Sequence, residues 1–367
     1  MKTKINQLMK NQAYKTGALL VAALFLFSLA LSGQEEVSKE YHKDYTAKKG
    51  TALDLSNRYG DVIVATSDNN QVVIDIKVTV RYPNRERADK LLSYIDVQFE
   101  ESENLISSRT VIDEKFSFTG WGSESRKFTI DYNVKMPVWM DLTLANRYGN
   151  TELDELDGNV NLDIKYGNLT AARLTRGNVK PLSVLNLAYG KGTIDEAGWL
   201  DATINSGNFN ITKSQALLID SKYSSINIGT TSSLVGETRH DKFTVGNVNN
   251  LVLDGGYADI NVGSLARKLT FEGGYGSFNL DAVPAGFESL EVETRYMGVS
   301  LGIDESASYN LDARVSYGGL KFNEENFKYQ KRIVENTSSE TTGVVGKDES
   351  PSATVKVNAS YGTVRLF

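Results

Sequence analysis

The most constraining feature of this sequence is a repeated frame with an aromatic residue at its centre. In the stretch Leu251–Val262, apolar residues fall two apart before Tyr257, at Leu251 and Leu253, and two apart after it, at Ile260 and Val262. The alternation slips by one residue across the tyrosine. This pattern is typical of two short strands that each bury alternate side chains and meet at a corner containing one extra residue.

The frame recurs along most of the chain. Five successive centres from Tyr189 to Tyr257 lie 17 residues apart, and the other gaps between Tyr148 and Tyr317 are 18 to 23 residues. The residue six places before the centre is apolar in every copy except at Ser183, and the residue five places after it is never polar. The centres are Tyr59, Tyr148, Tyr166, Tyr189, Ser206, Tyr223, His240, Tyr257, Tyr275, Tyr296, Tyr317 and Tyr361.

A period of this length predicts a solenoid, in which each unit stacks on the next. A single unit buries too few apolar side chains to offset the entropy lost on ordering it, so it needs neighbours that pair its backbone and cover its inward residues. The chirality of parallel β crossovers favours a right-handed coil. We therefore predict an all-β fold: a right-handed parallel β-solenoid (β-helix) with an N-terminal β-rich cap that contains one short helix.

The tyrosine column has two interpretations. A tyrosine at an internal corner, in phase with buried leucines, is more typical of packing, whereas rings exposed in a line would favour carbohydrate binding. In either case the rings should follow one another at strand spacing, about 4.8 Å. The glycine that commonly follows the centre would allow a positive φ or a close approach at the corner. Apolar residues eight places past several centres hint at a third side of each unit, at Leu156, Leu174, Val248, Leu265 and Val283.

The N-terminus is predicted to be a signal peptide over residues 1–33. Four lysines precede a continuous apolar run from Ala18 to Leu31, and small residues around Gly33 offer a cleavage site. The apolar run is short for a membrane span, so export with cleavage is favoured over the alternative of an uncleaved anchor, and no transmembrane span is expected in the mature chain. Removing four lysines and no acidic residue changes the formal net charge from −6 to −10. This acidic balance argues against nucleic acid as a partner.

The remaining chain divides into three predicted parts. Residues 34–50 form a flexible charged leader, and residues 51–137 hold a first rung and the N-terminal cap. Within the cap, 72–82, 96–112 and 126–136 read as strands, 85–95 reads as an amphipathic helix, and Trp121 lies in a loop. Residues 138–367 form the solenoid array, with a mobile loop at 323–353 that is rich in Ser, Thr, Glu and Gly. The last unit, Val355 to Leu366, is expected to be the outermost rung, with an edge open to a partner's strand.

The sequence lacks the residues that most catalytic and metal-binding sites require. The chain has no cysteine, which excludes disulfides, thiolate metal sites and a cysteine nucleophile. His42 and His240 lack metal-ligand spacing, and His240 at a repeat centre is interpreted as a corner filler. Candidate carboxylates for a polysaccharide lyase or hydrolase exist at Asp254, Asp259 and Glu272, although acidic residues are scattered along most units and are typical of a solvated face.

One family resemblance is visible in the repeat. The unit Asn57-Arg-Tyr-Gly-Asp-Val62, the strand ending at Met136-Pro137 and the recurring apolar-x-apolar-x-x-x-Tyr-Gly pattern resemble the bacterial putative-adhesin family of the autotransporter-head type. The resemblance spans roughly residues 50–367 and rests on the repeat rather than on a chemical signature. It implies an exported, non-enzymatic protein of the cell envelope or surface, and the family supplies no ligand residues to carry over.

The sequence thus predicts an adhesin-like β-solenoid that acts by binding or structural support. We expect no catalytic, cofactor-binding or metal-binding residues and no cofactor. The expected partner is a surface glycan or an envelope protein, and the binding residues are not identified by the sequence. The expected location is the periplasm, the outer-membrane surface or the exterior of a bacterium.

Overall fold

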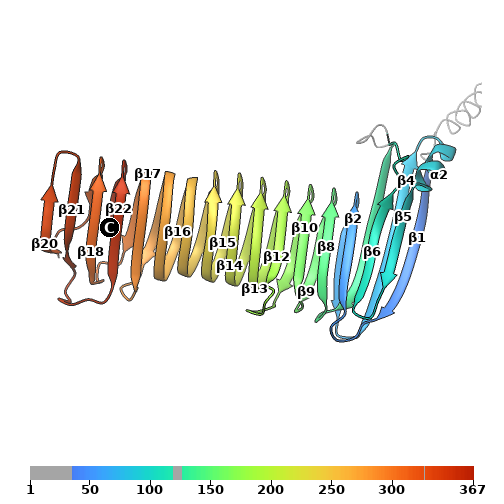
Figure 1. Cartoon of the computed structure of the whole chain (residues 1–367), viewed down its shortest axis with the longest axis horizontal. Coiled ribbons are helices and arrows are strands. Elements are labelled where there is room, and N and C mark those ends of the chain that lie inside the picture. The colour runs from blue at the N-terminus through green and yellow to red at the C-terminus, as the bar shows by residue number, and fades with distance from the viewer. Residues whose placement is uncertain (1–34, 119–125, 326) are drawn as a thin grey trace, which may run out of the picture. The chain divides into compact units, whose positions relative to one another are not determined.

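The computed structural model describes residues 35–118, 126–325 and 327–367. The predicted signal peptide and Trp121 lie outside these residues. The described chain is all-β with one helix (Figure 1). It divides into two units. The first unit includes residues 77–96, and the second includes the twelve repeat centres and all residues from 130 to 367. No helix among the described residues is both long enough and apolar enough to cross a membrane.

The first unit contains the predicted helix, shorter than expected. α2 (Arg85–Leu92) begins after Asn84, whose side chain accepts a hydrogen bond from the backbone N–H of Arg87 at 2.8 Å. Ala88 and Leu91 form its buried face. Phe116, Phe118 and Phe128 pack against one another in the same unit, with ring centroids 4.8 to 6.1 Å apart.

The predicted leader is a strand rather than a flexible segment. β1 (Glu35–Thr46) pairs with β4 (Gln71–Tyr82). Its side chains are mostly exposed and charged, which is why the sequence alone suggested a loose segment. Ion pairs with β4 are part of the explanation, since Glu36 lies 2.5 Å from Arg81. The exposure of that pair limits its contribution, so the backbone pairing is the main cause of order.

The first rung pairs on both sides. β2 (Ala52–Arg58) is parallel to β6 (Leu105–Ile112) and to β8 (Asp141–Arg147), so Leu53 lies beside both Ile106 and Leu142. β3 (Val62–Ser67) is likewise parallel to β7 (Lys127–Pro137) and β9 (Thr151–Leu156). β5 (Ile95–Glu101) precedes β6. The strands expected around 72–82, 96–112 and 126–136 are therefore confirmed.

The repeats that follow pair in parallel with a constant register. Leu200, Leu217, Leu234 and Leu251 occupy equivalent places on adjacent strands, and each is at most 1% exposed. The expected shared interior is therefore present across these repeats. The apolar residues eight places past the centres are also buried, including Leu156 and Leu265. The strands are β10 (Val160–Lys165), β11 (Leu169–Leu174), β12 (Ser183–Ala188), β13 (Lys191–Asn205), β14 (Asn208–Lys222), β15 (Ser225–Arg239), β16 (Lys242–Val283) and β17 (Ser289–Ile303).

Each corner depends on an unusual backbone conformation of its central residue. All twelve centres, Ser206 and His240 included, have φ between 51° and 66°. The expectation that glycine would supply the positive φ is therefore wrong at most corners, since the central residue itself adopts it. The glycine supplies the close approach: a Cβ on Gly149 would lie 1.9 Å from the carbonyl oxygen of Gly60.

Buried asparagines complete the first corners. Asn57 donates through its amide nitrogen to the carbonyl oxygens of Ile130 at 2.9 Å and Gly60 at 3.2 Å, and Asn146 donates to that of Asn150 at 3.0 Å. These bonds tie the buried amides to backbone carbonyls at the corner and on the neighbouring rung, and the Asn150 carbonyl also accepts from the backbone N–H of Val62 at 2.9 Å. The Asn two places before Tyr59 and Tyr148 is thus a structural part of the corner.

The last rung is not outermost, contrary to expectation. β22 (Thr354–Ser360) lies between β17 and β18 (Tyr309–Ser316), in parallel pairing with both (Figure 1). β23 (Thr363–Leu366) likewise pairs with β17 and β19 (Gly319–Lys321). The proposal that this segment offers an open edge is therefore wrong.

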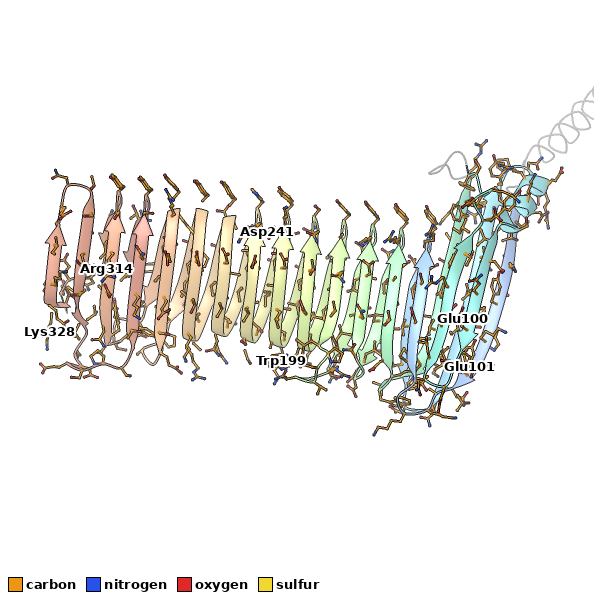
Figure 2. The ribbon with its side chains drawn as sticks, in the orientation of Figure 1. Glu100, Glu101, Trp199, Asp241, Arg314 and Lys328 are labelled. Carbon is orange, nitrogen blue, oxygen red and sulfur yellow. The ribbon has the colours of Figure 1, made fainter. Side chains whose placement is uncertain are left out.

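The predicted mobile loop forms the end of the sheet instead. β20 (Phe327–Val334) and β21 (Ser338–Val345) make an antiparallel hairpin, and β21 pairs antiparallel with β18. The sheet is therefore of mixed orientation rather than wholly parallel. Ser and Thr are compatible with strands, so the composition that suggested mobility did not exclude a hairpin. Lys331 on β20 forms an ion pair with Glu340 on β21 at 2.7 Å, and Arg314 on β18 lies 3.6 Å from the same carboxylate (Figure 2).

The buried Tyr309 at the start of β18 should make the folded protein less stable at alkaline pH. Its side chain is 5% exposed, and burial raises the pKa of the phenol from 10.0 to about 12. Because the folded protein holds this proton more tightly than the unfolded chain does, its contribution is intact below pH 10 and is lost between about pH 10 and 12. The loss should be about 2–3 kcal/mol in all. We expect Tyr309→Phe to reduce the fall in unfolding free energy between pH 9 and pH 11, measured by denaturant titration. An unchanged slope in the variant would contradict this assignment.

Candidate functional site: the tyrosine ladder

The most distinctive surface of the second unit is the row of aromatic corners, here called the tyrosine ladder. It consists, in spatial order, of Tyr59, Tyr148, Tyr166, Tyr189, Tyr223, His240, Tyr257, Tyr275, Tyr296, Tyr361 and Tyr317, with Ser206 between Tyr189 and Tyr223. The nine tyrosines after Tyr59 are 39 to 59% exposed. The prediction that this column packs internally is therefore wrong. Figure 2 shows the corner side chains projecting in a row along one side of the strands.

The backbone explains why the rings point outward. With φ positive at the centre, the chain turns sharply there, and the backbone of the glycine that commonly follows lies close against that of the neighbouring rung. The flanking Leu, Ile and Val residues fill the interior, and the ring is left at the outside of the corner. The spacing of apolar residues alone does not show whether the ring points inward or outward, because the alternation shifts by one residue at the tyrosine.

The rings stack on one another rather than presenting open faces. Neighbouring centroids lie 4.6 to 5.0 Å apart, with interplanar angles of 2 to 17°. The spacing expected from the repeat is therefore confirmed. Each ring within a continuous run covers the faces of its neighbours, so solvent reaches mainly the ring edges and hydroxyls. The ladder thus offers a regular line of hydroxyl groups and not the flat aromatic platform on which sugar rings stack.

Cationic side chains accompany part of the ladder. The Nζ of Lys222 lies 5.3 Å from the ring centroid of Tyr223, and the Arg295 guanidinium lies 5.4 Å from that of Tyr296. Arg58, Arg147 and Lys165 form a row on three adjacent strands, each directly before its tyrosine. The ladder therefore combines hydroxyls with positive charges on an otherwise acidic protein.

The ladder is interrupted at Ser206. Ala188, Asn205 and Lys222 are register partners on adjacent strands, so Tyr189, Ser206 and Tyr223 are the next residues on three successive rungs. Ser206 keeps the corner conformation, with φ 53°, but lacks a ring. A shallow hollow of about 480 Å³ lies here, lined by Asn168, Gly190, Lys191, Ser206, Gly207, Asn208, Tyr223, Ser224 and Ser225. The sequence signal for this site is Ser206 itself, a polar residue at a position that is aromatic in the other copies of the repeat.

His240 is a ladder ring, as expected of a corner filler. Its centroid lies 4.9 Å from those of both Tyr223 and Tyr257. The next residue, Asp241, replaces the usual glycine and is 5% exposed (Figure 2). Its carboxylate accepts hydrogen bonds from the hydroxyls of Ser221 and Thr238, both at 2.7 Å. Asp241 therefore has a structural role, because its carboxylate accepts hydrogen bonds from hydroxyl groups buried at the corner.

The other histidine, His42, lies between two carboxylates. The ring nitrogens of His42 lie 2.6 Å from a carboxylate oxygen of Asp75 and 2.8 Å from one of Asp44. These hydrogen bonds, to Asp75 first and then Asp44, raise the pKa of the exposed imidazole. No cluster of three or more potential metal ligands occurs among the described residues.

The candidate catalytic carboxylates do not form one converging group. Asp254 forms an ion pair with Arg239 at 2.8 Å, whereas Asp259, beyond the corner, accepts a hydrogen bond from Ser277 at 3.0 Å. Asp254 and Glu272 do share a hollow of about 500 Å³, without Asp259. Asp254 also continues a column of acidic register partners that includes Asp220 and Glu237. These carboxylates repeat at strand spacing along an outer face.

Comparisons with known proteins give low similarity. No family model matches this sequence, and no curated protein matches it either. A structure described as a putative adhesin from Bacteroides fragilis has a TM-score of 0.31 and 10% identity, over 90% of this chain and 97% of that chain. A putative adhesin from Parabacteroides distasonis has a TM-score of 0.31 and 14% identity, over 71% and 96%. A putative lipid binding protein from Parabacteroides distasonis has a TM-score of 0.28 and 11% identity, over 91% and 97%. These values are too low to assign a function to this chain.

Removal of one ring from the ladder should measurably destabilise the protein. Tyr166 stacks on Tyr148 at 5.0 Å and on Tyr189 at 4.9 Å. Since each aromatic pair contributes about 0.5–1.5 kcal/mol, Tyr166→Ala should lower the unfolding free energy by about 1–3 kcal/mol. In Tyr317→Ala, the matched control at the ladder's end, only the described stack on Tyr361 is lost. The unfolding free energy of Tyr317→Ala should fall by about half as much, with both variants measured by denaturant titration. Equal small losses in both variants would show that stacking adds little.

Proposed function

We propose that this protein is an exported, adhesin-like β-solenoid that binds a surface glycan along its tyrosine ladder. The observation that carries this proposal is the exposure of the ladder, because rings that only packed the interior would be covered. Regularly spaced hydroxyls and nearby cations suit an extended polymer with hydroxyl and acidic groups. The alternative partner is an envelope protein, which would bind the same rigid surface.

The scaffold of this proposal is a right-handed β-solenoid. Its support is the constant 17-residue register from β13 to β16, with parallel pairing and buried leucines at equivalent places. Right-handedness follows from the preference of parallel β crossovers. A solenoid holds its corners at strand spacing, so it would present ligand groups in a rigid line at no further cost in ordering.

The proposed role includes no catalysis. The acidic column of Asp220, Glu237 and Asp254 favours the alternative, a polysaccharide-active lyase or hydrolase, because paired carboxylates at about 5–5.5 Å serve retaining glycosidases. Such an enzyme also needs its two carboxyl groups in different environments. Here they occupy equivalent positions on successive strands.

Export is proposed from the lysine-rich and apolar segment at residues 1–33. Placement in the periplasm, at the outer-membrane surface or outside the cell would bring the ladder to envelope glycans. Replacing two residues of the apolar run by arginine should keep the protein in the cytoplasm. Cell fractionation would measure this, and an unchanged distribution would remove the export step from the proposal.

A glycan-array experiment on residues 34–367 tests the proposed ligand. The matched variant carries Tyr→Phe changes at positions 148, 166, 257 and 275, which keep the stacked rings and remove four hydroxyls. We expect the protein to bind a subset of the glycans and the variant to bind the same subset at least tenfold more weakly. Absence of glycan binding by the unaltered protein would overturn the ligand assignment. Turnover of any polysaccharide in a parallel assay would overturn the non-catalytic role.

A further inference from the structure

The missing ring at Ser206 creates a gap in an otherwise regular stack. Adjacent ladder rings lie 4.6 to 5.0 Å apart, so the rings of Tyr189 and Tyr223, two rungs apart, are separated by about 9.6 Å. This separation leaves room for one six-membered ring in contact with both faces. Tyr189 stacks on Tyr166 and Tyr223 stacks on His240 through their other faces, and Ser206 between them has no ring. The gap is therefore a place within the ladder where two aromatic faces, and not only edges, are open.

The hollow that adjoins the gap at Ser206 and Tyr223 carries polar side chains with unused hydrogen-bonding capacity. The side chains of Lys191, Asn208 and Ser225 line the hollow and have no hydrogen-bond partner within the described part of the chain. Ser224 differs, since its hydroxyl already donates to the carbonyl oxygen of Lys222 at 2.8 Å. The gap therefore has two aromatic walls, and the adjoining hollow offers a cation, an amide and a hydroxyl.

We propose that this gap binds a single pyranose ring of a glycan, held between Tyr189 and Tyr223. Sugar rings have apolar faces that stack on aromatic rings and hydroxyls around their edges, which matches the walls and the adjoining hollow. A plain aromatic side chain from a partner protein would match the walls but would offer no hydrogen bond to the exposed Lys191 and Asn208. The proposal rests on glycan binding as the proposed function and assigns it a specific site.

The geometry also sets the direction of the bound chain. A sugar ring between the two tyrosines lies parallel to them, so its plane is across the ladder and not along it. Equatorial linkages leave such a ring within its own plane, and the rest of the glycan therefore crosses the ladder. The part of the chain that the structure describes has one gap of this kind, at Ser206, so one bound ring per protein is expected.

The decisive variant fills the gap. Ser206 already has the backbone conformation of the ladder tyrosines, so Ser206→Tyr restores the missing ring without changing the corner. The matched control is Ser232→Tyr, which adds a tyrosine at an exposed position of β15 outside the ladder. An increased melting temperature of Ser206→Tyr relative to both other proteins would show that the gap has the size of one ring.

Binding is measured on residues 34–367 by saturation-transfer NMR, with methyl β-D-glucopyranoside, methyl β-D-galactopyranoside and methyl α-D-mannopyranoside as probes. At about 10 mM, this method detects dissociation constants in the millimolar range typical of small weak ligands. At least one glycoside should receive saturation from the protein and from Ser232→Tyr, and the signal should fall at least tenfold in Ser206→Tyr. If Ser206→Tyr does not fold, Tyr223→Ser, which removes one wall, should show the same loss.

Three results would overturn the proposal. They are absence of transfer to all three glycosides, equal transfer in the gap-filled variant, and gap-dependent binding of p-cresol without binding of any glycoside. The last would assign the gap to an aromatic side chain of a partner. The glycan array distinguishes these failures from failure of the proposed function, because array binding that persists in Ser206→Tyr keeps the ladder as a glycan surface and removes only the gap.

Discussion

Replacement of Gly167 by alanine is expected to prevent normal folding of the central repeats. A Cβ at this position would lie 1.9 Å from the carbonyl oxygen of Gly149 and 2.7 Å from its carbonyl carbon. Both are backbone atoms of a rung held in register on each side, so no side-chain movement relieves the clash. The rungs would have to separate locally. We expect a loss on the order of 4 kcal/mol or more, the range of the most damaging single substitutions.

The control for this substitution is Gly298→Ala. Gly298 lies in β17, two residues after the corner centre Tyr296, and a Cβ there would have no heavy atom within 4 Å. Its exchange should change the unfolding free energy by less than about 0.5 kcal/mol. Urea titration followed by circular dichroism compares the two variants with the unaltered protein. Similar stability of both variants would contradict the close stacking of glycines at the corners.

Removal of the last fifteen residues is expected to detach the C-terminal end of the sheet. Residues 353–367 supply β22 and β23, which lie between β17 and the strands β18 and β19. Val355, Val357, Val364 and Leu366 are at most 4% exposed, and their burial contributes about 6–12 kcal/mol. Without them β17 and β18 lose their common partner. The hairpin of β20 and β21, which pairs with β18, should separate from the array with it.

Limited trypsin digestion followed by mass spectrometry measures this effect. In a protein that ends at residue 352, cleavage after Arg314 and Lys321 should be at least tenfold faster, while the region before β17 stays resistant. A synthetic peptide of residues 353–367 should restore resistance by occupying the vacant rung, with Tyr361 between Tyr296 and Tyr317. A peptide with Val355→Glu and Val357→Glu is the control and should not. Equal resistance of the truncated and full-length chains would contradict the inserted rung.

Much of the fold could be predicted from residue spacing, because burial follows a short-range rule. Alternate residues on a strand point to opposite sides, so Leu217, Leu234 and Leu251 at equal intervals had to share an interior. The pitch of the ladder followed in the same way from strand spacing. The helix after Asn84 was also readable, since its cap and apolar spacing are local.

The features that could not be predicted depend on which of several equivalent strand edges a segment pairs with. The residues of β22 carry the same pattern as every other rung, and nothing in that pattern states that they enter between β17 and β18. The strand β1 and the hairpin of β20 and β21 are polar segments, ordered by backbone pairing with whichever edge is free. Ser206 is evident in the sequence as a polar centre, but it predicts a gap only once the neighbouring rings are known to stack on the outside of the corners.

The amino-acid sequence by itself therefore determined the repeat, its period and the identity of its buried side chains, because these follow from alternation along each strand. Only the tertiary structure decided the direction of the tyrosine rings, the order of the last rungs and the presence of an open gap at Ser206. The physical reason is that these depend on the sign of φ at the corners and on which strand edges remain unpaired when the repeats assemble. Neither quantity is encoded in the spacing of apolar residues.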